Sequence, residues 1–342
     1  MRSEPTNAIV FHEHGSAEVL KWERKELSPP GRGELQLRHT AIGVNFIDIY
    51  DRSGLYPRPL PETPGREAAG VVVALGPGVR GFKPGQRVAY VVAAAGAYSE
   101  RRNINASHVV KLPPGIADEQ AAALMLKGLT AEYLLRRTYR VQRGDHVLVH
   151  AAAGGVGSLV TQWARVLGAR VMGIVGTEAK LAVAKRQGCH QVFLAGRDDI
   201  VESVRRYTRG RMADVVYDSV GKDTFIESLD CLRRRGMMVS FGNASGPPPP
   251  IAPLELARRG SLFLTRPSLF DYIATRESLE AAARAMFALV RAKKLRVHIG
   301  QRYALADAAQ AHNDLEMRRT VGASVLIPAG PAPATPAAHT KG

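Results

Sequence analysis

The glycine-rich segment at residues 151–157 carries the clearest chemical signal in the sequence. It reads Ala-Ala-Ala-Gly-Gly-Val-Gly, and it lies between an apolar run at 146–152 and an apolar helical pattern at 156–167. Glycines let a backbone approach a pyrophosphate closely, and the first turn of a helix offers free N–H groups and a positive dipole. Alanine at the first glycine position departs from a strict Gly-x-Gly-x-x-Gly pattern. A strand, this turn and a helix together still predict a dinucleotide-binding site.

The residues that follow the next apolar run, 171–175, bear on the choice of dinucleotide. NAD sites usually place a carboxylate there to hold the ribose 2′-hydroxyl. This sequence has Gly176 and Thr177 instead, no acid before Glu178, and Lys180 one turn into the next predicted helix. The missing acid and the nearby cation favour NADPH, although Lys180 taken alone could be an ordinary solvated lysine.

Residues that could ligate a metal are scarce. The two cysteines, Cys189 and Cys231, have no CxxC spacing, and we interpret both as structural thiols. Among the ten histidines, the two closest in the sequence are His12 and His14, which fall in a predicted turn. Zinc sites need several thiolate or imidazole ligands, so we expect no metal.

The elements that must position the phosphate loop form two patterns. Short apolar runs between Gly and Pro turns predict a mostly β first domain. After a predicted helix at 118–136, apolar strands alternate with helices, which indicates an α/β chain with a doubly wound parallel Rossmann sheet. We predict this dinucleotide domain at 126–269 and a first domain at 1–125 that is completed by 270–328. The Pro/Ala/Gly-rich residues 329–342 are predicted to form a disordered tail.

Composition limits the class of protein. The 342 residues, 45% of them hydrophobic, suffice for two domains with a sizeable core. No apolar run reaches the roughly 18 residues of a membrane span, and the first residues lack a signal-peptide pattern, so we expect a cytoplasmic protein. The net charge of +16 favours anionic ligands and could attract nucleic acid. Its cations are spread along the chain, which favours a solvated basic surface.

The sequence resembles the NADPH:quinone oxidoreductase (zeta-crystallin-like) branch of the zinc-free medium-chain dehydrogenases/reductases from about residue 9 to residue 328. The segments that carry the resemblance, besides the phosphate loop, are Gly43-Val44-Asn45-Phe46-Ile47-Asp48, Arg52-Ser53-Gly54-Leu55-Tyr56-Pro57, Leu126-Lys127-Gly128-Leu129-Thr130, Tyr217-Asp218-Ser219-Val220-Gly221, Ser240-Phe241-Gly242-Asn243 and Thr265-Arg266-Pro267-Ser268-Leu269. The resemblance implies a GroES-like fold for the first domain, NADPH as cofactor, a quinone as acceptor and a homodimer. The homodimer would pair at an exposed sheet edge around 262–265.

Zinc-dependent alcohol dehydrogenases share this architecture and take a zinc ligand from a Gly-His-Glu motif. The matching stretch here is Gly65-Arg66-Glu67, with arginine in the histidine's place, and no cysteine precedes Cys189. A guanidinium is no zinc ligand, so this comparison also predicts a reaction without zinc.

The resemblance implies a role for individual residues. Asn45 and Tyr50 are expected to orient the acceptor, and the alternative for each is a hydrogen bond that braces the loop. The expected cofactor contacts are Asn45, Phe46, Asp48 and Tyr50 beside the nicotinamide and its ribose, Thr130 and Tyr133 near the nicotinamide amide and phosphate, Gly155 and Val156 at the pyrophosphate, Gly176, Thr177 and Lys180 at the 2′-phosphate, Ser219, Phe241, Gly242 and Asn243 under the cofactor, Ser268 and Leu269 at its nicotinamide end, and Arg318 at a phosphate or ribose.

One position departs from the family. Relatives often have a tyrosine near the adenine and the 2′-phosphate, just after the third strand of the Rossmann domain. Here that position is Ala195, followed two residues later by Arg197. The departure predicts looser NADPH binding, for which Arg197 could compensate.

The predicted reaction is direct hydride transfer between the domains, without metal or flavin. A positioned donor suits a quinone, because its reduction restores aromaticity. Two other functions remain open: reduction of an enone or enoyl thioester with the same cofactor, and RNA binding. RNA binding is not favoured, because no basic stripe rich in aromatic residues accompanies the charge.

Overall fold

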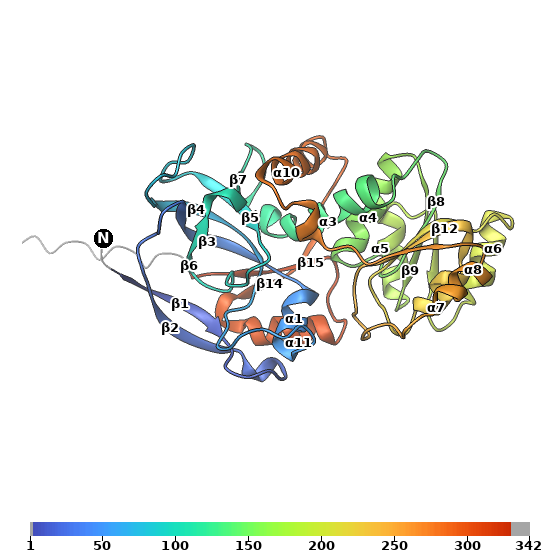
Figure 1. The fold of residues 1–342 in the computed structure, drawn as a ribbon, viewed down its shortest axis with the longest axis horizontal. Coiled ribbons are helices and arrows are strands. Elements are labelled where there is room, and N and C mark those ends of the chain that lie inside the picture. The colour runs from blue at the N-terminus through green and yellow to red at the C-terminus, as the bar shows by residue number, and fades with distance from the viewer. Residues whose placement is uncertain (1–2, 330–342) are drawn as a thin grey trace, which may run out of the picture.

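The computed structural model describes residues 3–329, and these form two lobes that lie side by side, each built on its own β-sheet (Figure 1). The predicted tail therefore lies outside the described residues, apart from Ala329. In the described part of the chain no helix is long and apolar enough to cross a membrane.

One lobe holds a parallel sheet in the order β10-β9-β8-β11-β12-β13. Two apolar clusters cover its opposite faces. Val147 and Val149 belong to the cluster that contains Leu159 and Val160 of α4, whereas Leu148, between them, belongs to the cluster on the opposite face. Strands buried on both faces read as continuous apolar runs, which is why the sequence revealed them. The strands are β8 (His146–Val149), β9 (Arg170–Val175), β10 (Gln191–Leu194), β11 (Ala213–Asp218), β12 (Leu232–Ser240) and β13 (Phe263–Thr265). The helices are α4 (Gly155–Val166), α5 (Ala179–Gln187), α6 (Ile200–Thr208), α7 (Phe225–Asp230) and α8 (Pro253–Arg258).

The other lobe is a mostly β domain whose sheet has the order β14-β15-β3-β4-β5-β7, with β6 also paired to β3. The end of the chain returns to this lobe, because Ser324 of β15 pairs antiparallel with Val44 of β3. A separate hairpin joins β1 and β2. The strands are β1 (Glu4–Val10), β2 (Lys21–Leu27), β3 (Glu34–Val44), β4 (Glu67–Leu75), β5 (Arg87–Val91), β6 (Arg101–Asn105), β7 (Val109–Lys111), β14 (Ile299–Ala304) and β15 (Ala323–Ile327).

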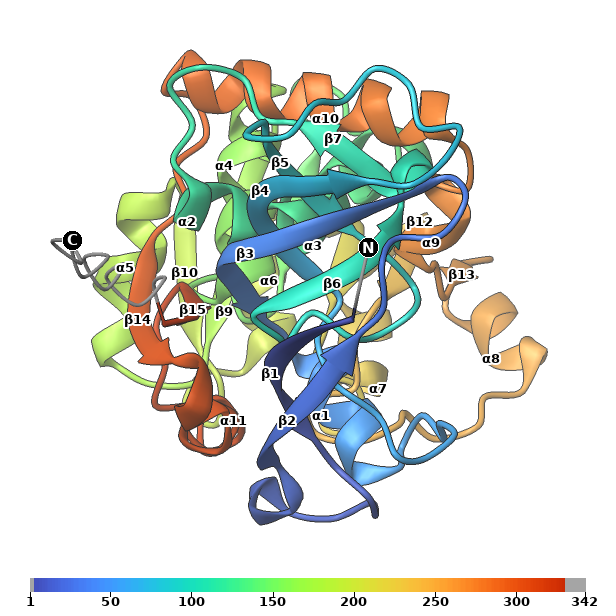
Figure 2. The ribbon, with the colours of Figure 1, turned by 90° about the vertical axis from the view of Figure 1, so that its left-hand side faces the viewer.

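Further helices join and cover the two lobes. In both views α10 lies across the top of the molecule, where it packs on α3, whereas α1 and α11 lie at its lower side (Figures 1 and 2). The helices are α1 (Phe46–Ser53), α2 (Asp118–Ala122), α3 (Met125–Tyr133), the π-helical turn η3 (Leu134–Thr138), α9 (Leu269–Tyr272), α10 (Arg276–Arg291) and α11 (Ala308–Glu316). Three short 3₁₀ turns complete the described elements: η1 (Ala17–Val19), η2 (Ala106–His108) and η4 (Leu305–Asp307).

The predicted fold class is confirmed: a doubly wound parallel sheet stands beside a mostly β domain. Two local expectations were wrong. The single helix expected at 118–136 is divided into α2, α3 and η3. The segment with Asn45 and Tyr50, expected as a loop, is the N-cap and first turns of α1.

Candidate active site

Asn45 is the N-cap of α1, and hydrogen bonds hold both its backbone and its side chain in place. Its backbone N–H donates to Asp48 Oδ2 at 2.9 Å, which closes the first turn of the helix. Its side-chain Nδ2 donates to Glu67 Oε1 at 2.8 Å. The amide nitrogen is thereby engaged, and the side-chain oxygen Oδ1 is left as the group that Asn45 can offer to a ligand.

Glu67, at the start of β4, is fully buried and bonds to two further groups. Lys127 Nζ lies 2.9 Å from Oε1, and the backbone N–H of Leu126 donates to Oε2 at 2.5 Å. A Cβ at Gly43 would collide with the same carboxylate, so glycine is needed in β3. The buried carboxylate thus connects β4 with the N-terminus of α1 and the start of α3.

Lys127 extends this network to the phosphate loop. Its stem packs against Gly155, where an added Cβ would come within 2.9 Å of Lys127 Cδ. The side chain of Lys127 is 6% exposed, and the carboxylate of Glu67 is its ion-pair partner. The ion pair therefore joins the two places where we expect the cofactor: the glycine-rich turn and Asn45.

The phosphate loop has the geometry that the sequence predicted. β8 runs into the turn, α4 begins at Gly155, and its N-cap Gly154 makes no side-chain cap hydrogen bond, which leaves the first N–H groups of the helix free for an anion. At Gly157 an added Cβ would run into the carbonyl oxygen of Ala151, so helix and turn can pack this closely only with glycine there.

Tyr50 connects the two lobes. Its hydroxyl oxygen accepts a hydrogen bond from the backbone N–H of Asn243 at 3.0 Å, just beyond the end of β12. Burial, above all, raises the pKa of Tyr50 to about 12, so the hydroxyl keeps its proton near neutral pH. That proton has no acceptor among the described residues, which makes Tyr50 a donor for an incoming oxygen.

Tyr56 and Arg266 extend the contact at Tyr50. The rings of Tyr50 and Tyr56 meet edge to face at 5.3 Å between their centroids. Arg266 donates to the Tyr56 hydroxyl at 3.2 Å and to the carbonyl of Gly242 at 3.2 Å. The two phenols and the guanidinium form one polar cluster beside Asn243.

Two acceptors at this edge of the sheet lack partners. Asn243 Oδ1 and Ser240 Oγ are buried and have no hydrogen-bond partner within residues 3–329. Buried polar atoms are normally satisfied, so these orphans fit a site that is completed by a polar ligand. They support a dinucleotide at the carboxyl ends of the strands.

The residues expected at the 2′-phosphate lie at the end of β9. Gly176 and Thr177 are exposed, and Lys180 Nζ donates to the carbonyl of Arg318 at 3.1 Å. Lys180 and the backbone of Arg318 thus meet from opposite lobes. Arg197 is engaged with Glu178 and Asp198, each at 3.1 Å, so its compensation for the tyrosine missing at Ala195 is not evident in the structure.

Tyr133, on α3, stacks on Tyr272 of α9 with ring centroids 4.4 Å apart and planes at 16°. Arg137 donates to the carbonyl of Tyr272 at 2.7 Å, and Thr130 lies buried one turn before Tyr133. This stack fixes α3 against the segment that follows β13. The remaining predicted residues lie at strand ends or beside them: Ser219 after β11, Phe241 and Gly242 after β12, Ser268 and Leu269 before and at the start of α9, Phe46 and Asp48 in α1, and Val156 in α4.

Asp48 is held inside the protein. Burial, reinforced by nearby Asp51, raises the pKa of Asp48 to about 7. Its Oδ2 accepts hydrogen bonds from Asn45 N and from the hydroxyl of Tyr98, at 3.1 Å in the latter case. Oδ2 therefore braces α1, whereas the buried Oδ1 has no hydrogen-bond partner within residues 3–329.

Arg66 stands at the position of the zinc-ligating histidine of zinc-dependent alcohol dehydrogenases, and here its role is structural. Its guanidinium is buried, pairs with Asp51 at 2.5 Å and bonds to the carbonyl of Ala93. It also lies over the ring of Phe270, 5.8 Å from the centroid, which links α1 to the segment at α9. Within residues 3–329, no group of three His, Cys, Asp or Glu side chains could hold a metal ion.

Sequence reasoning missed five residues that the structure places in this site: Tyr56, Glu67, Lys127, Arg266 and Tyr272. All five stand in or beside the quoted motifs, but a motif does not show which side chains pair across 60 or 210 positions, as Glu67–Lys127 and Tyr56–Arg266 do. The signal that could have identified Lys127 is a single charged residue within an otherwise uncharged motif.

Comparisons with known proteins agree with this architecture. Residues 31–135 match the family described as alcohol dehydrogenase GroES-like domain, and residues 155–288 match the family described as zinc-binding dehydrogenase. The chain is 49% identical over 323 residues to quinone oxidoreductase 1 of Escherichia coli (strain K12). The matched region covers 94% of this chain and 99% of that protein. It is 45% identical over 329 residues to 2-haloacrylate reductase of a Burkholderia species, covering 94% and 98%.

The solved structures include a close relative with its cofactor. The Escherichia coli quinone oxidoreductase complexed with NADPH superimposes with a TM-score of 0.92 at 49% identity, over 94% of this chain and all of that one.

Proposed function

The chain belongs to the quinone oxidoreductase family, and we propose that it transfers a hydride from NADPH to a quinone where Tyr50 of one lobe meets Asn243 of the other. It is an NADPH-dependent oxidoreductase. The observation that carries the proposed site is the hydrogen bond between these two residues, because it brings the predicted acceptor-binding helix to the carboxyl ends of the Rossmann strands.

NADPH supplies the hydride when it is bound. The chain's own residues have the tasks of holding and orientation: the free N–H groups of α4 for the pyrophosphate, Lys180 for the 2′-phosphate, and Asn45 Oδ1 for a hydroxyl of the nicotinamide ribose. Tyr50 can donate its free proton in a hydrogen bond to a quinone oxygen, where negative charge grows during reduction. The unpartnered oxygens of Ser240 and Asn243 can accept hydrogen bonds from the cofactor.

Steady-state kinetics test this proposal. We expect faster turnover with NADPH than with NADH, using 1,4-benzoquinone and 1,2-naphthoquinone as acceptors. Asn45→Ala should lower turnover at least tenfold, on the order of what a lost orienting group costs. Tyr50→Phe should lower it as well, whereas Tyr207→Phe on α6, whose hydroxyl makes no hydrogen bond in the described structure, should leave it unchanged. Wild-type kinetics in Asn45→Ala would remove that residue from the site.

A second candidate reaction is reduction of an activated carbon–carbon double bond. The relative named 2-haloacrylate reductase, at 45% identity, favours it, and the hydride donor would be the same. A panel of quinones and enones assayed with NADPH separates the two. Higher kcat/KM for every enone than for either quinone would make this second reaction the better description.

We also propose that two copies pair along β13. This strand is at the edge of the parallel sheet, and the side chain of Phe263 there is 54% exposed. Exposed apolar edges are usually paired or covered. Light scattering at micromolar concentration should give the mass of a dimer, and Phe263→Lys should shift it toward the monomer. A monomeric wild-type protein contradicts the pairing.

A further inference from the structure

A hollow of about 570 Å³ lies on the Rossmann lobe, away from the residues of the proposed active site. It is bounded by the last turns of α4 and α5 and by the segment that follows α10. Four cationic side chains line it: Arg165, Lys185, Arg186 and Lys294. We call it the basic hollow.

The side chain of Gln162 joins the three segments that bound the basic hollow. Gln162 of α4 donates to the side chain of Gln187 at 2.8 Å and to the carbonyl of Arg296 at 3.0 Å. Its own oxygen accepts from the backbone N–H of Arg296 at 2.8 Å. The walls are therefore held in place before any ligand arrives, which lowers the entropic cost of binding.

The cations of the basic hollow are not balanced by acids. Within the described part of the chain none of the four forms an ion pair, although all four are exposed. At its margin, burial and then the positive charges of Arg165, Arg170 and Lys185 lower the pKa of His190. The hollow thus has the electrostatic character of an anion site.

Helix capping explains only part of this cluster. Cations are favoured at the C-terminal ends of helices, and two of the four do bond to carbonyls there: Lys185 to His190 at 2.8 Å and Arg165 to Gly188 at 3.3 Å. Arg186 and Lys294 make no side-chain hydrogen bond to any residue in 3–329. Two cations therefore remain for a ligand, and the other two can turn toward it.

We propose that the basic hollow binds a compact, multiply charged phosphate anion of the oligophosphate class. Guanidinium groups and lysines are the usual partners of phosphate oxygens, and the volume suits a small ligand. None of the lining residues is aromatic, so nothing there would stack a nucleic-acid base. The one exposed apolar side chain, Val166, is too small an anchor for a membrane surface.

The topology allows this anion to bind together with the cofactor. The lining residues of α4 and α5 lie just before β9 and β10, so the basic hollow lies at the amino-terminal edge of the parallel strands. The phosphate loop follows β8 at the opposite, carboxyl-terminal edge. The basic hollow is therefore separate from the proposed active site.

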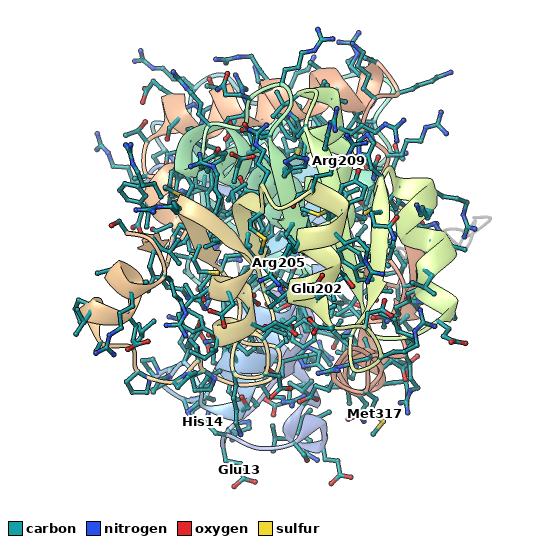
Figure 3. The ribbon with its side chains drawn as sticks, turned by 90° about the vertical axis from the view of Figure 1, so that its right-hand side faces the viewer. Glu13, His14, Glu202, Arg205, Arg209 and Met317 are labelled. Carbon is teal, nitrogen blue, oxygen red and sulfur yellow. The ribbon has the colours of Figure 1, made fainter. Side chains whose placement is uncertain are left out.

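Calorimetry with tripolyphosphate tests the proposal. The titrated sample is the full chain saturated with NADPH, so that the phosphate sites of the cofactor are filled. The double variant Arg165→Gln/Lys185→Gln should weaken binding at least tenfold. Its charge-matched control is Arg206→Gln/Arg209→Gln, in the last turn and at the C-cap of α6 (Figure 3 labels Arg209), which should bind within about twofold of wild type. If the first variant is unstable, Arg186→Gln/Lys294→Gln provides the same test without touching any hydrogen bond.

The possible outcomes separate the sources of the anion. Similar affinity for tripolyphosphate and ATP supports recognition of the phosphate chain, because both carry it. Four results overturn the proposal: loss of binding in the presence of NADPH, equal losses in the two charge-matched variants, binding of ATP alone, and tighter binding of an RNA oligomer that depends on the same cations. The first of these would place the anion in the cofactor site.

Discussion

Glu67 and Lys127 form a charged pair that solvent barely reaches. Burying such a pair is costly, and the benefit must come from what the pair holds in place. Here Oε1 of the carboxylate accepts from both Asn45 Nδ2 and Lys127 Nζ, while the lysine stem packs on Gly155. The pair therefore fixes the orientation of one proposed ligand-binding amide relative to the phosphate loop.

A double-mutant cycle on this pair separates stability from positioning. Lys127→Met strands the buried carboxylate and should cost about 3–5 kcal/mol of unfolding free energy. Adding Glu67→Gln removes the stranded charge, so much of that loss should return. Turnover should not return, because the new amide has a single oxygen for two donors, Asn45 Nδ2 and Leu126 N, and no longer fixes Asn45; we expect it to stay about tenfold low. Denaturant unfolding and quinone reduction with NADPH measure the two effects.

An exposed pair provides the control for this cycle. Arg205→Met/Glu202→Gln breaks a pair on α6 in which both side chains are more than half exposed (Figure 3), and we expect neither stability nor turnover to change noticeably. If the Lys127/Glu67 double variant recovers wild-type turnover together with its stability, the pair is structural only.

At the scale of elements, continuous patterns were predictable from the sequence. The strands of the Rossmann sheet are apolar on both faces, and the turn before α4 carries its own glycines. A local window of residues contains all the information that such elements need. The same holds for the anion-binding end of α4, where Gly157 is required by the carbonyl of Ala151 only six residues away.

The division of the helix expected at 118–136 could not be predicted in this way. α3 begins where the carboxylate of Glu67, 59 positions away, accepts the N–H of Leu126. It ends in a π-helical turn where the Tyr217 hydroxyl, 83 positions away, donates to the carbonyl of Leu134. Both ends depend on partners from other elements, so the propensity of the segment alone favoured one long helix.

The same reason limited the prediction of the candidate site. Resemblance identified Tyr50 and Asn243 as members of the site, but it did not show that they bond to each other across 193 positions. It also did not identify Tyr56 and Arg266, which meet only when the two lobes are assembled. Contacts between lobes are set by the fold, and the sequence contains no local record of them.

At the scale of the whole molecule, a buried chain of hydrogen bonds ties the last helix to the site helix. Arg52 lies 3.2 Å from His312 Nδ1, and His312 Nε2 lies 3.0 Å from the Tyr98 hydroxyl, which donates to Asp48. The arginine can only donate, so Nδ1 must accept and the imidazole must be neutral. Burial, together with the charge of Arg52, lowers the pKa of His312 to about 3.

The neutral His312 in this hydrogen-bond network makes the stability of the protein sensitive to acid. In the unfolded protein His312 titrates near pH 6.5, so between about pH 6.5 and pH 3 the unfolded state binds the extra proton and stability falls as pH falls. His39, whose pKa burial also lowers to about 3, acts in the same direction. Asp48 acts in the opposite direction, because its raised pKa adds stability as pH falls from about 7 towards its unfolded value near 4. A variant is therefore needed to isolate one contribution.

His312→Gln should remove the contribution of this histidine to the pH dependence of the unfolding free energy. For a single histidine that is neutral when folded, moving from pH 7.5 to pH 5.5 costs about 1.4 kcal/mol of unfolding free energy. The variant starts less stable at pH 7.5, and its deficit relative to wild type should shrink by about that amount at pH 5.5, as measured by urea unfolding at both values. His108→Gln, at an exposed residue whose side chain makes no hydrogen bond within residues 3–329, should keep the wild-type dependence. A deficit of the same size at both pH values would mean that His312 is not the acid-sensitive link between α11 and α1.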